Sequence, residues 1–284
     1  MGERRRGRAR VPGRRLRQRR VPVALTTVPP AVRRFAADGS LVMAGGRAIL
    51  LQIADPVVAA GVARHSDFAH RPQQRLVHTL QYVYAVVLGS PADARAAAAF
   101  VEHAHRPVQG ADDPDHQLWV AATLYESALR MHELLRGPVD PALAAAVLTA
   151  YEPLGGALRV PAGRWPSTPA AFDAYWRRTS AALRVTDEAR GVVRDLLHPR
   201  FAPVWIRALM PIARIVTVGM LPPDLRTAYG FAWGGSEQRR YDRTVAVLRR
   251  VVAAVPGPVR RLPFRVLLRS LRRAAARRTT VVGR

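Results

Sequence analysis

The chain has 284 residues, of which 49% are hydrophobic, and this is enough to build a large buried core. Forty-five arginines and no lysine stand against 20 acidic residues, which gives a formal charge of +25. Because the sequence has no cysteine, it excludes disulfides, thiolate metal sites, iron–sulfur clusters and a cysteine nucleophile, and it leaves histidine and the carboxylates as the strong metal ligands.

The positive charge is concentrated at the two ends of the chain. Residues 1–34 contain twelve arginines and one acid, residues 249–284 contain eleven arginines and no acid, and 22 arginines face 19 acids between them. Glycine and proline interrupt the first segment, so we expect residues 1–34 to be a disordered basic tail. Solvated tails are the preferred interpretation, and contact with anionic lipid or nucleic acid is the alternative. Charged residues and prolines also divide the apolar stretches, so we expect neither a signal peptide nor a transmembrane helix.

Helix starts are marked along the chain by prolines that follow a capping residue. The fixed φ of proline suits the first helical turn, and the side chain before it accepts hydrogen bonds from free backbone N–H groups. Such pairs open five alanine- or leucine-rich segments, at Asp55-Pro56, Ser90-Pro91, Asp113-Pro114, Asp140-Pro141 and Thr168-Pro169. Asp93, three residues after Ser90, further predicts a capping box.

Helical spacing of apolar residues continues through the rest of the chain, and strand signals are nearly absent. We expect helices near residues 46–53, 56–65, 72–88, 91–105, 114–136, 141–151, 169–183, 187–197, 202–217, 236–254 and 263–278. The sequence therefore predicts an all-α fold, with a single large multi-helix domain of about ten or eleven helices over residues 35–262. A basic amphipathic helix and tail follow over residues 263–284. This helix can cover the core or lie on an anionic membrane, and docking on the core is the preferred interpretation.

The predicted helix over residues 72–88 carries a polar face that is a candidate for function. Arg75, His78 and Thr79 stand at positions i, i+3 and i+4, so a cation, an imidazole and a hydroxyl share one side of an otherwise apolar helix. The trio is a candidate lining of a site. The helical pattern alone favours the other interpretation, an ordinary helix rim with a satisfied histidine.

The next helix ends in His103 and His105, which are two residues apart and therefore point to different sides. The pair cannot easily chelate one metal ion, but either histidine can be a lone ligand, and a single axial histidine is what a b-type haem requires. Without further information, a helix-terminal histidine is more often a group that caps the helix or contacts water than a ligand. His116 and His132 are too far apart on one helix to share a site. No serine lies in a nucleophile elbow, which disfavours a hydrolase.

Several motifs, in order, resemble the catalytic domain of the MpaB and rubber-oxygenase (latex-clearing protein) family. They are Gly45-Gly46-Arg47-Ala48-Ile49-Leu50-Leu51-Gln52, the run from Pro56 to Phe68, Arg75-Leu76-Val77-His78-Thr79, Val101-x-x-x-His105-x-x-Val108-x-Gly110, Asp113-Pro114-x-x-x-Leu118-Trp119-Val120-Ala121-Ala122-Thr123-Leu124, Phe172-x-x-Tyr175-Trp176 and Leu221-Pro222-Pro223. The resemblance covers roughly residues 35–275.

The resemblance implies an all-helical fold that holds a b-type haem and uses dioxygen. Rubber oxygenases cleave the carbon–carbon double bonds of polyisoprene, and a fungal member cleaves a prenyl chain. By motif position, His105 resembles the axial haem histidine, and Arg75 and Thr79 resemble the arginine and threonine of the haem-pocket motif. His78 stands where latex-clearing proteins have a lysine. An imidazole there can ligate iron or donate a hydrogen bond.

Two positions depart from the family pattern. Asp55 and Ala121 occupy places where the family usually has histidine, which removes two polar groups from the pocket. The leading hypothesis is a cytoplasmic haem b-dependent oxygenase, with His105 as proximal iron ligand, acting with dioxygen on an apolar, isoprenoid- or lipid-like substrate. The alternative is a catalytically degenerate helical scaffold whose arginine-rich tails bind a membrane surface or an acidic partner. Nucleic-acid binding ranks last, because the basic segments lack interleaved aromatic residues. The sequence leaves the substrate and the oligomeric state open.

Overall fold

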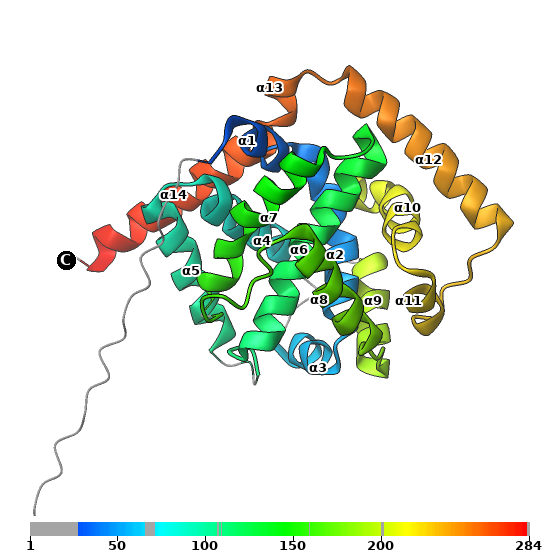
Figure 1. The fold of residues 1–284 in the computed structure, drawn as a ribbon, viewed down its shortest axis with the longest axis horizontal. Coiled ribbons are helices and arrows are strands. Elements are labelled where there is room, and N and C mark those ends of the chain that lie inside the picture. The colour runs from blue at the N-terminus through cyan, green and yellow to red at the C-terminus, as the bar shows by residue number, and fades with distance from the viewer. Residues whose placement is uncertain are drawn as a thin grey trace, which may run out of the picture.

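The computed structural model describes residues 28–65, 72–106, 108, 110–158, 160–199 and 202–282, and within these ranges it is helical and contains no strand (Figure 1). The predicted all-α fold is confirmed. The elements are α1 (Pro30–Ala36), the 3₁₀ helix η1 (Gly39–Ala44), α2 (Gly45–Gln52), α3 (Pro56–His65), α4 (Pro72–Leu88), α5 (Pro91–His105), α6 (Pro114–Arg136), α7 (Pro141–Gly156), α8 (Pro169–Ala181), α9 (Asp187–Leu197), α10 (Val204–Gly219), α11 (Pro223–Ala228), α12 (Gly235–Ala254), α13 (Gly257–Arg260) and α14 (Leu262–Val282).

The predicted caps are present at all five proline-marked helix starts. Ser90 and Asp93 form the expected capping box at the start of α5. At the other starts, the side chains of Asp55, Asp113, Asp140 and Thr168 accept hydrogen bonds from backbone N–H groups of the first turn. The start of each of these helices therefore follows from local sequence, because the cap satisfies N–H groups that the helix leaves free.

Helical structure begins earlier in the chain than the sequence predicted. Helix α1 starts at Pro30, inside the segment expected to be a tail, because Val32 and Phe35 place their side chains in the core with 0% and 3% exposure. The disorder expected for residues 1–27 falls outside the described residues. The short helices α11 and α13 were also not predicted, since six and four residues are too few to show a helical period.

Helix α6 is the central element of the fold (Figure 1). It is 23 residues long, packs against α2, η1, α7 and α12, and buries large side chains such as Trp119 and Tyr125. The Tyr125 ring meets Phe172 of α8 edge to face at 4.7 Å between ring centroids. Burial of these aromatic surfaces stabilises the packing of α6 in the core.

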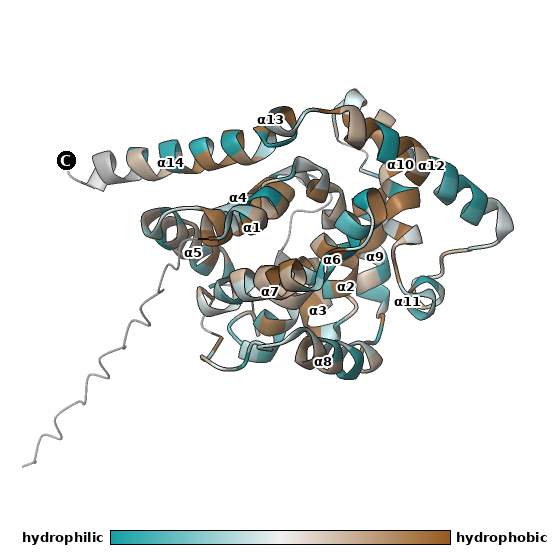
Figure 2. Ribbon diagram, turned by 45° about the horizontal axis from the view of Figure 1, so that its top comes forward, coloured by the Kyte–Doolittle hydropathy of each residue, from teal (hydrophilic) through white to brown (hydrophobic). Residues whose placement is uncertain are grey.

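Helix α14 docks on the core, as the preferred interpretation of its sequence predicted. Its apolar and polar residues separate by face, so that it appears as alternating brown and teal segments in Figure 2. The brown face packs against α4 and α5, where Leu268 and Leu271 are buried. Arg272 forms a two-pronged ion pair with Asp93, at 2.8 and 2.9 Å, and this pairing holds the pKa of Asp93 down at about 2.

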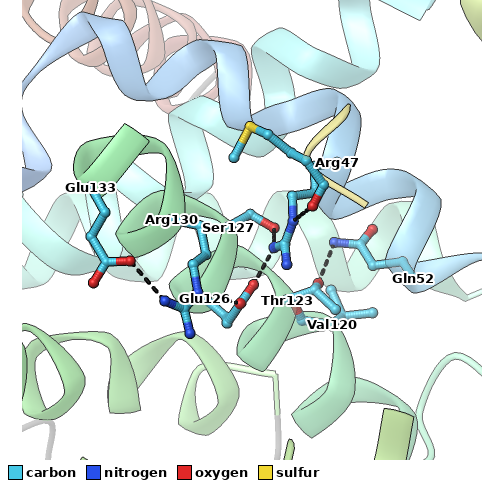
Figure 3. A network of polar contacts seen from close by, with 9 residues as sticks. Arg47, Gln52, Val120, Thr123, Glu126, Ser127, Arg130 and Glu133 are labelled. Carbon is cyan, nitrogen blue, oxygen red and sulfur yellow. Dashed lines mark hydrogen bonds and ion pairs between the residues drawn. The ribbon is translucent and has the colours of Figure 1, made fainter. Parts of the chain in front are cut away.

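A buried polar network joins α2 to α6 and α10 (Figure 3). Arg47 pairs with Glu126, donates to Ser127 Oγ at 2.9 Å and, through Nε, donates to the Met220 carbonyl oxygen at 2.8 Å. One turn further along α2, Gln52 donates to Thr123 Oγ1 at 3.0 Å. A buried charge is tolerated only when it is paired in this way, so the network fixes how α2 lies on α6.

No single helix in the described ranges is long and apolar enough to cross a membrane. The pair Gly39–Gln52 and Pro56–Arg64 meets the length and composition requirement only when taken together, across a bend of 109°.

Candidate functional site

The described residues enclose a cavity of about 460 Å³ between α3, α4, α5 and α6. Cofactor and small-molecule sites usually measure about 300–1,000 Å³ and are lined mostly by apolar side chains with a few polar groups. This cavity fits that description. Its walls are Gln52, Val57, Val58, Gly61, Val62, Gln74, His78, Thr79, Tyr82, Phe100, Val101, Ala104, His105, Val108, Gly110, Ala111, His116, Gln117, Val120, Ala121, Leu124, Leu154 and Leu158.

Helix α4 contributes the predicted polar pair to this cavity. His78 and Thr79 both line it, and the His78 ring meets Phe100 of α5 edge to face at 4.6 Å between centroids. Burial lowers the pKa of His78 below its ordinary value of 6.5, because desolvation disfavours the charged imidazolium. The imidazole is therefore neutral near pH 7 and has a lone pair available to a metal or a proton donor. The side chain of Arg75, the third predicted residue, lies outside the described residues.

Helix α5 contributes His105 at its last position. His105 lines the cavity and is partly buried, whereas His103 is exposed and does not line it. The two histidines thus differ in environment, as their spacing predicted. Because α4 and α5 pack against each other, His78, Thr79 and His105 come to one cavity from two helices.

The opposite wall contains polar groups that the sequence analysis did not select. His116 and Gln117 lie in the first turn of α6, and the Nδ1 atom of His116 and the Oε1 atom of Gln117 are buried with no hydrogen-bond partner among the described residues. His116 Nε2 lies 3.8 Å from Asp55 Oδ1, which makes an ion pair only when the imidazole is protonated. Buried polar atoms normally have partners, so these two indicate a site that receives a ligand or water.

His116 was not predicted as a site residue, and its sequence separation from His132 predicted only that the two cannot share a site. They do lie apart, since His132 lies near the other end of α6, where it packs against Phe35 at 4.9 Å between ring centroids and lines a separate cavity of about 270 Å³. No local pattern in the sequence marks His116 as a cavity residue, because tertiary packing brings it to the cavity.

Of the two positions that depart from the expected motif, Ala121 lines this cavity and Asp55 does not. Asp55 caps α3, and its carboxylate neighbours one lining residue, His116. Ala121 lines the cavity and is 2% exposed, and its methyl group leaves space where a larger side chain would project.

The side-chain donors of the cavity suit a prosthetic group such as haem, in which the group itself supplies most of the ligands of the metal ion. The described residues hold no group of three or more histidine, aspartate or glutamate side chains placed to bind one metal ion. A tetrahedral zinc site needs three or four protein ligands, whereas a haem iron needs one axial histidine.

A helical protein with one mostly apolar cavity and a histidine on each of three walls is consistent with a cofactor-dependent enzyme. Residues 32–250 match the family model described as "ER-bound oxygenase mpaB/B'/Rubber oxygenase, catalytic domain", and the chain belongs to this family. The matched span contains every residue of the cavity and ends before α13 and α14.

Two curated relatives come from mycobacteria, one named "Uncharacterized protein Mb2261" from Mycobacterium bovis and the other "Uncharacterized protein Rv2237" from Mycobacterium tuberculosis. Each is 32% identical to this chain over 222 residues, which cover 73% of this chain and 87% of the relative. No solved structure matches the chain significantly.

Proposed function

We propose that the chain is a haem b-dependent oxygenase that acts with dioxygen on an apolar, isoprenoid- or lipid-like substrate. One observation supports this most strongly. In a chain that belongs to an oxygenase family, the sequence-selected His78, Thr79 and His105 line a single cavity of about 460 Å³.

The residues present fit a haem group. The cavity offers one helix-terminal imidazole, at His105, as the proximal iron ligand, and its walls at Val58, Val62, Leu124 and Leu158 suit the apolar faces of a porphyrin. The volume lies within the range of cofactor sites. When bound, the haem would supply the redox chemistry that activates dioxygen.

The protein's own residues would bind and orient dioxygen and the substrate, and would exclude water from the cavity. His78, neutral because burial lowers its pKa, would be a hydrogen-bond partner for dioxygen or a further iron ligand, and the Thr79 hydroxyl would supply a second polar group. Gln117 Oε1 and His116 Nδ1 would find partners in a ligand or an ordered water. The remaining apolar wall favours a substrate without charge.

The test compares haem binding by the full chain and two variants of α5. The purified wild-type protein, supplied with haem, should show a Soret band that shifts on reduction and addition of carbon monoxide. His105→Ala should lose or shift that band, while His103→Ala, which changes an exposed histidine on the same helix, should leave it unchanged. A wild-type protein that folds but stays colourless with excess haem contradicts the proposal.

A second candidate, a non-catalytic scaffold, is favoured by Asp55 and Ala121, which replace two pocket histidines. If haem binds through His105 but dioxygen is not consumed with any unsaturated isoprenoid or lipid offered, this candidate becomes the better account.

A further inference from the structure

Helix α10 carries a large apolar face that the described part of the protein does not cover. Trp205, Leu209 and Ile212 are 66%, 53% and 43% exposed, and their spacing places them on one side of the helix. Val216 continues the same stripe one turn later but is 2% exposed, because it packs into the cluster with Val252 of α12. The apolar stripe of α10 is therefore buried at Val216 and exposed from Trp205 to Ile212.

Helix α12 packs along α10 and presents arginine beside apolar side chains. Figure 2 shows the brown surface of α10 next to the brown C-terminal half of α12, with the teal N-terminal half beyond it. Helical spacing puts one set of exposed residues on the solvent side of α12, opposite the buried Val245 and Val252; the set is Arg240, Arg243, Val247, Arg250 and Val251. None of these three arginines is ion-paired with a carboxylate in the described ranges.

The charge of the surrounding residues favours an anionic membrane over a second copy of the chain as the partner of the apolar face of α10. From residue 204 to residue 277 the chain contains 15 arginines and three acids. A second copy of the chain would bring equally positive surface against this one, and the repulsion would oppose dimer formation. An anionic bilayer attracts the arginines and receives the apolar side chains, and tryptophan favours the interface between headgroups and acyl chains.

We propose that α10 and α12 form a surface that docks on an anionic phospholipid membrane, with Trp205, Leu209 and Ile212 inserted at the interface and the arginines of α12 on lipid headgroups. This surface lies on folded helices, and so differs from the tail contact that composition alone suggested. It does not depend on the cavity or on haem.

The test measures binding of the full chain to lipid vesicles. The wild-type protein should sediment with vesicles of equal parts phosphatidylglycerol and phosphatidylcholine, and much less with pure phosphatidylcholine. Trp205→Gln combined with Leu209→Gln should weaken binding by roughly tenfold or more, because two large apolar side chains no longer leave water. Val77→Gln, which alters an exposed valine on α4, is the matched control and should bind normally.

Two further measurements separate insertion from general attraction. The tryptophan emission of the wild-type protein should shift to the blue with anionic vesicles, whereas Trp205→Phe should bind without that shift. Arg240→Gln with Arg243→Gln should weaken binding by roughly twenty-fivefold, at about fivefold for each arginine. Arg95→Gln with Arg177→Gln removes the same charge from α5 and α8 and should have a much smaller effect.

Three outcomes would overturn the proposal. The wild-type protein does not bind anionic vesicles; it binds, but the α10 substitutions leave binding unchanged, so that the attachment lies elsewhere; or the wild-type protein is a dimer that these substitutions convert to monomers, so that a second copy covers the face. Circular dichroism of each variant checks that its helix content matches that of the wild-type protein.

Discussion

Removing Arg47 should destabilise the fold more than any other single change to a charged residue. Arg47 is 4% exposed, and its guanidinium bonds to Glu126, to Ser127 Oγ at 2.9 Å and to the Met220 carbonyl oxygen at 2.8 Å. The guanidinium also lies 6.0 Å from the centre of the Trp176 ring. Arg47→Met keeps the length of the side chain but leaves the carboxylate of Glu126 buried without its main partner.

The expected loss is about 3–5 kcal/mol in the free energy of unfolding, which is typical when one member of a buried ion pair is removed. Arg130 still contacts Glu126 at 3.1 Å, but it is about half exposed and compensates only partly. Urea denaturation followed by circular dichroism measures the change, provided that the slope of the transition is unaltered.

Two control variants make the test specific. Arg130→Met removes the exposed partner of the same carboxylate and should cost less than about 1 kcal/mol. The double variant Arg47→Met with Glu126→Leu removes both charges and should recover most of the lost stability. If Arg47→Met costs no more than Arg130→Met, the buried network does not hold α2 on α6 as argued.

Three other predictions follow from packing and from burial. Gly46→Ala would place a methyl group against Thr217 and should cost about 1–3 kcal/mol in unfolding free energy, and Thr217→Ala should relieve much of it. Ala121→Leu should fill part of the cavity and weaken haem binding by about tenfold without loss of helix content, as measured by haem titration and circular dichroism. In the haem-free protein, burial lowers the pKa of His78, so its imidazole should titrate by NMR below the ordinary value of 6.5. Because the unfolded chain then takes up that proton first, the His78 contribution to stability is complete above pH 6.5 and declines as the pH falls toward the folded-state pKa; a titration midpoint at or above 6.5 would refute this.

Much of the helical framework could be predicted because its signals are local. The starts of α3, α5, α6, α7 and α8 depend on a cap and a proline that are adjacent in sequence, and they were predicted at the residue observed. Helix α1 was not predicted, since Val32 and Phe35 gain their stability from contacts with residues distant in sequence. Helix α7 runs to Gly156, past its predicted end and through Pro153, which shows tertiary packing overriding a local stop signal.

Only the side of the candidate site formed by α4 and α5 could be predicted from the sequence. His78, Thr79 and His105 share a cavity because they lie on two helices that are consecutive in sequence and packed together, and their motif spacing made them visible. Gln52, His116 and Gln117 reach the cavity only through the packing of α2 and α6, which no local pattern encodes. That these three residues line the cavity is therefore visible only in the three-dimensional structure.

The most direct test of the proposed function is the haem content of the 284-residue chain, produced in cells supplied with a haem precursor and measured as pyridine haemochrome per mole of chain. The proposal predicts close to one haem b per chain in the wild-type protein and a large reduction in His105→Ala, with the helix content of both unchanged. A folded wild-type protein that carries no haem, or a His105→Ala variant that retains it fully with an unaltered spectrum, would contradict the assignment of this cavity as the haem site.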